Sequence, residues 1–189
     1  MGKLILVIGQ TGSGKGALIS SLRQTFPEIL FPVSCTTRAI RPGEVEGETY
    51  FFVTPEEFQQ KVDNGEFLEW TTTDSHRYGT LKSQILKPVE EGHVVLREVD
   101  VKGAHEIIGG LLPREHVFSI YIDAGSWEEL ETRILSRASM SQEELESRRL
   151  RYSIEAPFKQ EADFVVENKT GKLEVAQHDI KEVVREIIG

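Results

Sequence analysis

The sequence predicts an α/β fold with a three-layer core, in which helices cover both faces of a parallel sheet. Short apolar segments alternate with segments of helical spacing towards both ends of the 189-residue chain. This alternation is typical of parallel sheets. In the middle, recurring aromatic residues break the pattern, which indicates a small mixed α/β lobe inserted into the core. Near the carboxyl end, a polar, arginine-rich stretch of helical propensity indicates a helical lid.

We expect the whole chain to form a single domain, since its length suits one hydrophobic core. The core is assigned to three segments, about 1–33, 81–135 and 156–189. The inserted lobe is assigned to about 34–80 and the lid to about 136–155.

Four core strands are predicted from short, unbroken apolar runs, which suit strands that are buried on both faces. They are Lys3–Gly9, His93–Asp100, Val117–Asp123 and Ala162–Asn168.

A segment of helical spacing follows each predicted strand. After the first strand, Leu18, Leu22 and Phe26 lie four residues apart. Pro27 ends this helix, because proline cannot continue one. The other helices are expected at about Val101–Leu111, Ser126–Arg137 and Leu173–Ile188.

The inserted lobe contains β-prone pieces and one helix-like piece. The β-prone pieces read TYFFV, FLEWTT and RYGT, and the helix-like piece reads TPEEFQQKVDNG. The predicted lid reads SRASMSQEELESRRLRYSIE, from Ser136 to Glu155.

Composition and charge exclude several classes of protein. The chain is 39% hydrophobic and 28% charged, as in ordinary globular proteins. Its net charge of −9 argues against broad binding to nucleic acids or anionic membranes. The apolar run Leu4–Ile8 is too short for a membrane span, and the single cysteine, Cys35, suits a reducing compartment. We therefore expect a cytoplasmic protein that binds neither nucleic acid nor membrane.

The stretch GQTGSGKGAL contains a phosphate-binding loop (P-loop). Gly9, Gly14 and Lys15 match G-x-x-x-x-G-K between a predicted strand and a predicted helix. Glycines let backbone N–H groups converge on phosphate oxygens, and the lysine adds positive charge. The alternative is an ordinary glycine-rich turn with a surface lysine. The residues expected to hold the nucleotide phosphates are Gly9, Gln10, Thr11, Gly12, Ser13, Gly14, Lys15, Gly16 and Ala17.

The loop lacks the hydroxyl that usually binds Mg²⁺. Gly16 stands where serine or threonine normally follows the lysine, and Ala17 supplies no hydroxyl either. Magnesium can instead be held through phosphates and its own waters. Asp100 ends a predicted core strand beside the loop, so we expect it to position Mg²⁺ directly or through water.

Further motifs identify a family. They read SCTTRAIRPGEVEGETYFF from Ser34 to Phe52, followed by GEFLEW, YGT and VDVKGA. With these motifs the chain closely resembles the guanylate kinases, which transfer phosphate from ATP to GMP. The resemblance extends from the phosphate loop to Asn168 and implies ATP and GMP as substrates, dGMP as a further acceptor and Mg²⁺ as cofactor. The sequence leaves open whether the protein is a monomer or a homodimer.

The resemblance implies a GMP site. Arg38, Arg41, Tyr50 and Tyr78 match residues that grip the GMP phosphate. Planar arginines and phenols are suitable donors to a dianion. The implied guanine readers are Ser34, Glu69 and Thr80, and the full implied set is Ser34, Arg38, Arg41, Glu44, Tyr50, Glu69, Tyr78, Thr80 and Asp100.

Glu69 is the most informative member of this set. One carboxylate can accept from both the ring N–H and the exocyclic amine of guanine, and adenine offers no such pair of donors on that edge. Without the resemblance, Glu44, Tyr50 and Tyr78 would be assigned structural roles, since surface ion pairs and core tyrosines are common.

The resemblance also implies the groups that act in phosphoryl transfer. They are Lys15, Arg133, Arg137 and Arg148, with Asn168 near the adenine of ATP. Such a reaction needs charge neutralisation more than a nucleophilic side chain. Arg149 and Arg151 are interpreted as solvated neighbours.

Two positions depart from the family pattern. Arg97 stands where an apolar residue is usual, and we expect it to reach the surroundings of Glu98 or the substrate cleft. Ile40 stands where proline is usual. Two alternatives stay open: a non-catalytic guanylate-kinase-like module that binds protein ligands, and a kinase for another phosphorylated ribose compound.

Overall fold

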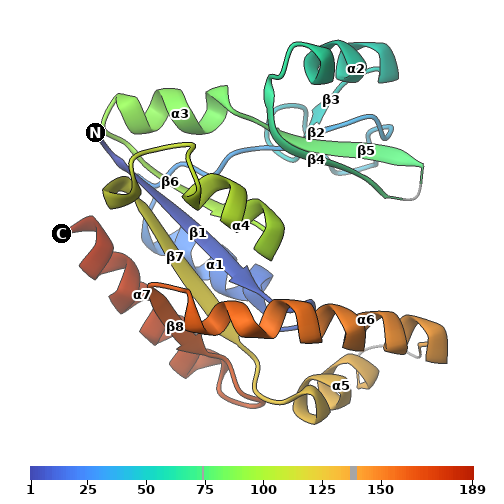
Figure 1. Cartoon of the computed structure of the whole chain (residues 1–189), viewed down its shortest axis with the longest axis vertical. Coiled ribbons are helices and arrows are strands. Elements are labelled where there is room, and N and C mark those ends of the chain that lie inside the picture. Colours follow the sequence, from blue (N-terminus) through green and yellow to red (C-terminus); the bar gives the residue numbers. More distant parts are fainter. Residues whose placement is uncertain (74, 137–139) are drawn as a thin grey trace.

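The computed structural model describes residues 1–73, 75–136 and 140–189. Its core is a parallel sheet with the strand order β6, β1, β7, β8 (Figure 1). The four strands are β1 (Lys3–Gly9), β6 (Val94–Glu98), β7 (Val117–Asp123) and β8 (Phe164–Glu167). All four predicted core strands are confirmed; β1 and β7 have the predicted bounds, and β6 and β8 are shorter than predicted. Leu30 adds a parallel bridge to Val95 beyond the β6 edge.

Helices cover both faces of this sheet because successive side chains of a strand point to opposite faces. On one face, Ile5 and Val7 pack with residues of α1 (Lys15–Thr25) and α7 (Leu173–Ile188). On the other face, Leu4 and Leu6 pack with residues of α3 (Ser83–Glu90) and α4 (Val101–Ile108). The predicted three-layer α/β core is confirmed. The short 3₁₀ segment η1 (Arg114–His116) precedes β7.

The sequence pattern does not predict α3. Pro88 lies inside this helix, and proline is unfavourable there because it removes a hydrogen bond. Ile85 and Val89 are fully buried against the sheet. This packing stabilises a helix that local propensity does not favour.

The small lobe contains a second, mixed sheet with the strand order β3, β2, β5, β4. Its strands are β2 (Cys35–Thr36), β3 (Phe51–Phe52), β4 (Phe67–Thr73) and β5 (His76–Leu81). The helix α2 (Pro55–Asp63) begins at a capping box formed by Thr54 and Glu57. Phe58, Phe67 and Cys35 form the core of the lobe, and burial raises the pKa of the Cys35 thiol. The strand β2 was not predicted.

Two helices follow β7 and form the other side of the molecule. They are α5 (Trp127–Leu135) and α6 (Gln142–Glu155), and the 3₁₀ segment η2 (Ala156–Gln160) leads back to the core. Figure 1 shows α6 extending beyond the core sheet, on the same side as the small lobe. No residue of α6 is buried, and Tyr152 packs its ring edge-on against Trp127 of α5. Among the described residues, no helix combines the length and hydrophobicity needed to cross a membrane.

Candidate active site

The phosphate loop leaves the carboxyl end of β1 and enters α1. Gly12 and Gly14 have φ angles of 92° and 90°, which place both residues in the left-handed region that favours glycine. A Cβ atom on Gly14 would lie 2.4 Å from Nδ2 of Asn168. The glycine at position 14 is therefore required both by its conformation and by close packing.

Lys15 lies across this loop. Its Nζ donates to the carbonyl oxygens of Gly9, at 2.5 Å, and Gln10, at 3.1 Å, and it lies 3.5 Å from Oε1 of Glu98. The lysine side chain is 11% exposed. The chain thus holds one positive charge directly over the loop, at the place where phosphates would be neutralised.

The side chains of Asn168 and Arg133 stabilise the loop through hydrogen bonds to backbone carbonyl groups. Nδ2 of Asn168 donates a 2.7 Å hydrogen bond to the carbonyl of Ser13, and Nη1 of Arg133 donates to the carbonyl of Asn168 at 2.6 Å. Arg133, Asn168 and Gly14 also line a shallow cavity of about 250 Å³. The structure therefore brings Arg133 and Asn168 together beside the loop.

Gln10 has a structural role through its side chain. Its Nε2 donates to the hydroxyl of Tyr121, and both residues are buried. Burial, reinforced by the nearby Asp123, raises the pKa of Tyr121 far above its ordinary value. The phenol therefore stays neutral and anchors the start of the loop to β7.

A central cavity of about 740 Å³ opens at the carboxyl end of the core sheet. Residues of the phosphate loop, β4, the end of β6 and α6 line it together. The lining residues are Gly9, Thr11, Lys15, Glu69, Thr71, Thr72, Arg97, Glu98, Val99, Asp100, Gly103, Arg151 and Glu155.

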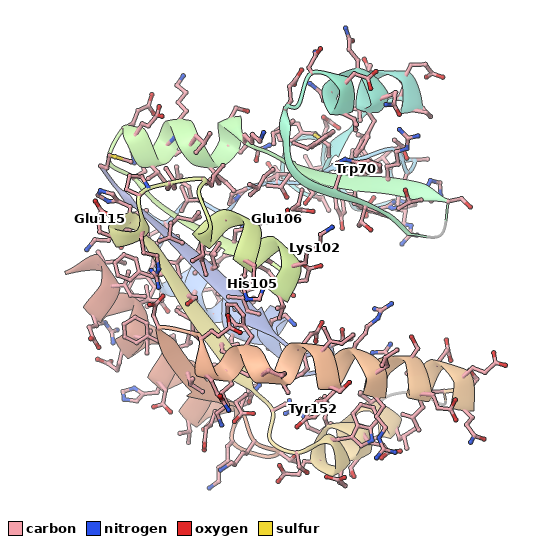
Figure 2. All side chains as sticks on the ribbon, viewed as in Figure 1. Trp70, Lys102, His105, Glu106, Glu115 and Tyr152 are labelled. Atoms are coloured by element: carbon pink, nitrogen blue, oxygen red, sulfur yellow. The ribbon has the colours of Figure 1, made fainter. Side chains whose placement is uncertain are left out.

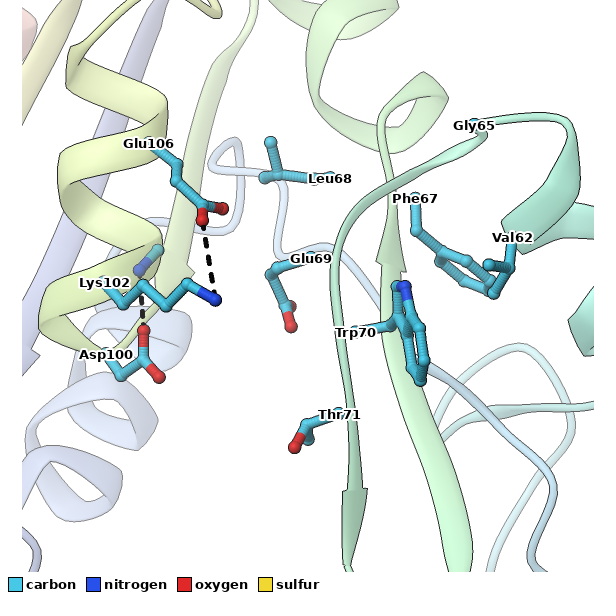
Figure 3. Close-up of a pocket in the computed structure, with 11 residues that line it drawn as sticks. Val62, Gly65, Phe67, Leu68, Glu69, Trp70, Thr71, Asp100, Lys102 and Glu106 are labelled. Atoms are coloured by element: carbon cyan, nitrogen blue, oxygen red, sulfur yellow. Dashed lines mark hydrogen bonds and ion pairs between the residues drawn. The ribbon is translucent and has the colours of Figure 1, made fainter.

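A second cavity of about 530 Å³ adjoins the first, between β4 and α4. The two cavities share Glu69, Thr71, Asp100 and Gly103. Figure 2 shows Trp70 of the small lobe and Lys102 of α4, which both line this second cavity. In Figure 3 the carboxylate of Glu69 projects from β4 into the space between the two elements.

The three residues predicted to read guanine lie together. Oε1 of Glu69 accepts a 2.6 Å hydrogen bond from the hydroxyl of Thr80. Nη2 of Arg97 donates to the same Oε1 at 3.2 Å and to Oγ of Ser34 at 3.0 Å. Arg97 therefore connects two of the predicted readers, and the expectation that it reaches the cleft is confirmed by its place in the cavity lining.

The residues predicted to grip the GMP phosphate form a separate cluster within the small lobe. Arg38, which is 7% exposed, binds both carboxylate oxygens of Glu44, at 2.7 and 3.0 Å. The guanidinium carbon of Arg38 lies 5.5 Å from the centre of the Tyr50 ring, and the Tyr50 and Tyr78 rings are 5.9 Å apart. The side chain of Arg41 is exposed.

Glu44 has a clear role within this cluster. Hydrogen bonds from the Arg38 guanidinium and from the backbone N–H of Arg41 hold the pKa of Glu44 below its ordinary value. The ionised carboxylate orients Arg38 and positions the loop that carries Arg41. The resemblance was needed to single out Glu44, because its sequence neighbourhood alone indicates only a surface carboxylate.

Comparison with known proteins agrees with this geometry. The family model for guanylate kinase matches residues 1–187. The chain belongs to the guanylate kinase family. It is 35% identical over 184 residues to the guanylate kinase of Thermotoga maritima, covering 97% of this chain and 86% of that one. It is 39% identical over 167 residues to the guanylate kinase of Trichormus variabilis, covering 88% and 82% of the two chains.

A solved structure supports the same assignment. The crystal structure of guanylate kinase from Anaplasma phagocytophilum matches with a TM-score of 0.67 and 28% identity, covering 99% of this chain and 86% of that one. The predicted family, fold class and enzyme class are therefore confirmed: the protein is an enzyme of the guanylate kinase family.

The carboxylates near Lys15 suit a magnesium ion that the nucleotide carries with it. Glu98 and Asp100 both line the central cavity, and Oδ1 of Asp100 caps α4 by accepting from the Gly103 N–H at 2.7 Å. Within the described residues, no group of three or more His, Cys, Asp or Glu side chains could hold a metal ion. A magnesium ion carried by a nucleotide can take its other ligands from phosphate oxygens and waters.

The predicted transfer arginines lie in different places. Arg133 lies beside Ser13 and Asn168, outside the lining of the central cavity. Arg148 is partly buried on α6 and is not among the described residues that line this cavity. Arg151, interpreted from the sequence as a solvated neighbour, does line it. The signal that could have found Arg151 is its spacing from Arg148 and Glu155, which places all three on one helical face. Arg137 lies outside the described residues.

Proposed function

We propose that this enzyme transfers the γ-phosphoryl group of ATP to GMP, and also to dGMP, with GDP or dGDP as the product. One observation carries the proposal: a single cavity of about 740 Å³ is lined by both Lys15 and Glu69. The first residue belongs to a phosphate loop and the second is suited to reading guanine. A donor phosphate and an acceptor nucleotide can therefore meet in one cavity.

The acceptor base would be recognised by hydrogen bonds. Oε1 of Glu69 is held by Thr80, and the carboxylate can accept from N1–H and from the 2-amino group of guanine. Ser34 supplies a further hydroxyl at the same place. Because this recognition uses the base and the phosphate, loss of the ribose 2′-hydroxyl in dGMP should be tolerated.

The acceptor phosphate would be bound by Arg38, Arg41, Tyr50 and Tyr78. In the structure Arg38 pairs with Glu44, and this ion pair orients the Arg38 guanidinium before the phosphate of GMP binds. Movement of this cluster towards the core would bring the acceptor phosphate to the cavity that Lys15 lines, and such lobe closure is common in enzymes that must exclude water.

The donor would bind along the phosphate loop. Its adenine would lie near Asn168, beside the cavity of about 250 Å³ that Asn168 lines. Mg²⁺, carried by the phosphates beside Glu98 and Asp100, would neutralise part of their charge when bound. Lys15 would bind the outer phosphates, and Arg133, Arg137 and Arg148 would stabilise the charge that spreads over the transferring group.

The two alternative functions explain fewer residues. A non-catalytic binding module has no need of Lys15 over an intact glycine loop or of a lid rich in arginine. A kinase for another phosphorylated ribose compound has no need of the hydrogen-bonded Glu69 and Thr80 pair. We retain a cytoplasmic location and a monomeric or homodimeric state as parts of the proposal, the location being supported by the single buried cysteine.

The deciding experiment is a coupled assay of ADP release with GMP, dGMP, AMP, CMP and UMP offered in parallel in the presence of ATP and Mg²⁺. We expect rapid turnover with GMP and dGMP and little with the other three. Calorimetric binding of GMP without any ADP release would support the binding module instead. Equal turnover with all five nucleotides would contradict the proposed reading of guanine.

A further inference from the structure

Arg97 is a charged residue of the core sheet to which the proposed reaction assigns no role. It lies on β6, in register with Leu6 of β1, and its side chain is 19% exposed. A charge so placed needs polar partners. It has two, Oγ of Ser34 at 3.0 Å and Oε1 of Glu69 at 3.2 Å. Both partners are predicted readers of guanine, so Arg97 lies where the base would be read.

The Arg97 guanidinium has more N–H donors than its protein partners use. A guanidinium carries five N–H donors and no acceptor. Among the described residues, the hydrogen bonds found for this side chain come from Nη2, and no acceptor is found for Nη1. The side chain also lines the central cavity together with Glu69. Donors are thus available to an acceptor on a ligand in that cavity.

We propose that Arg97 is a specificity-determining residue that donates a hydrogen bond to the C6 oxygen of a 6-oxopurine nucleotide. This inference rests on the proposed function, because it takes Glu69 as the acceptor for N1–H of the base. In guanine the C6 oxygen lies beside N1–H on the same edge. A guanidinium 3.2 Å from Oε1 of Glu69 is placed to reach that oxygen. Arginine is a suitable donor to this atom, as its contacts with guanine in nucleic acids demonstrate.

Arg97 and Glu69 together would disfavour adenine at both C6 and N1 of the base. Adenine carries an amino group at C6, which would direct its own N–H at the guanidinium donors. Its N1 is unprotonated and would direct a lone pair at the carboxylate. A site whose polar groups lose their partners in this way discriminates strongly between similar ligands.

A purely positioning role for Arg97 makes a different prediction. In that case Arg97 would only hold Glu69 in position. Removal of Arg97 would then weaken the binding of every purine nucleotide whose 2-amino group Glu69 binds. A donor to the C6 oxygen matters only for nucleotides that have this oxygen. The two roles therefore separate when the groups at C2 and C6 are varied independently.

The test uses the variants Arg97→Leu and Arg97→Gln with four nucleotides. GMP has both groups, IMP has the C6 oxygen without the 2-amino group, 2,6-diaminopurine ribonucleoside monophosphate has the 2-amino group without the oxygen, and AMP has neither. We expect kcat/KM for GMP and IMP to fall roughly 10- to 100-fold in Arg97→Leu, the range for loss of a hydrogen bond to a charged group. The value for the diaminopurine nucleotide should stay unchanged or rise. Arg97→Gln, which keeps an amide NH₂ group as donor, should lose less.

Calorimetric binding of the same nucleotides in the absence of ATP provides a second readout. Arg185→Gln is the matched control, because Arg185 pairs with Glu182 on the surface of α7. Circular dichroism shows whether each variant is folded, and Arg97→Gln carries the test if Arg97→Leu does not fold. Equal losses for GMP and the diaminopurine nucleotide would overturn the proposal, as would unchanged values for GMP and IMP. If the unmodified enzyme fails to phosphorylate GMP, the proposed function fails, and the binding ratios still decide the role of Arg97.

Discussion

The hydroxyl of Thr80 donates a 2.6 Å hydrogen bond to Oε1 of Glu69 across the β4–β5 pair of the small lobe. This bond fixes one carboxylate oxygen, and among the described residues no protein donor is found for the other. The carboxylate is thus oriented by the protein and still has acceptor capacity for a ligand.

Glu69→Gln should therefore reduce the preference for guanine. The amide keeps the size of the side chain but has only one acceptor oxygen, and its own N–H group opposes one of the two guanine donors. We expect a loss of about 2–4 kcal/mol in transition-state stabilisation with GMP, or roughly a thirty-fold to nearly thousand-fold drop in kcat/KM. The value for AMP should fall much less or rise, so the two substrates converge. Equal slowing with both nucleotides would show that Glu69 is a structural residue.

Lys15→Ala should remove the charge that lies over the phosphate loop. We expect kcat to fall by about 100- to 1,000-fold or more, the range for loss of one strong electrostatic contact in a transition state. Calorimetric affinity for GMP should change little, because Lys15 belongs to the ATP side of the cavity. Lys87→Ala, an exposed lysine on α3, serves as the control. Unchanged turnover in a Lys15→Ala variant with normal circular dichroism would refute phosphoryl transfer at this loop.

Gly14→Ala should destabilise the protein, whereas Gly16→Ala should not. An alanine at position 14 would adopt a left-handed conformation, with its Cβ 2.4 Å from Nδ2 of Asn168. We expect the free energy of unfolding to fall by about 1–3 kcal/mol. A Cβ on Gly16 has no atom within 4 Å, and alanine is the better helix former by up to about 1 kcal/mol. Urea unfolding of both variants checks the contrast, and similar stabilities would contradict it.

Glu155 should make the stability of the enzyme depend on pH. Burial, with a smaller contribution from Asp100, raises its pKa in the folded protein, and Lys15 and Arg151 oppose that shift. As the pH rises past the unfolded-state pKa, the carboxyl group of Glu155 ionises in the unfolded chain before it ionises in the folded protein. The contribution of Glu155 to the free energy of unfolding therefore falls until the pH reaches the folded-state pKa, and it is constant above that pH. Glu155→Gln should flatten this decline and raise the urea midpoint at neutral pH. A lower midpoint at neutral pH in the variant would contradict this assignment.

ATP and GMP together should draw the small lobe and the lid towards the core. The predicted phosphate-gripping cluster around Arg38 lies outside the lining of the central cavity, and α6 has no buried residue. Arginines on both sides would approach the phosphates when these are bound. Small-angle X-ray scattering should show a smaller radius of gyration with a bisubstrate analogue at saturation. Identical profiles with and without the analogue would argue against closure.

Local patterns in the sequence determined the core strands, the helices that follow them, and the phosphate loop. Each of these depends on neighbours along the chain: an apolar run ending in glycine predicts β1, and the spacing of Gly9, Gly14 and Lys15 predicts a loop that holds phosphate. The family resemblance added the expected GMP-site residues, and the structure places Ser34, Glu69 and Thr80 near one another.

Only the tertiary structure decided which distant residues meet. The helix α3 forms because Ile85 and Val89 pack on the sheet, although Pro88 disfavours it locally. Ser34, Glu69 and Arg97 come from separate segments, and their mutual distances depend on how the small lobe is placed against β6. Sequence spacing carries no information on such contacts, because they arise from the packing of elements far apart in the chain. The family resemblance showed that Arg97 stands where an apolar residue is usual. Only the folded chain showed that it lies between two residues suited to reading a base.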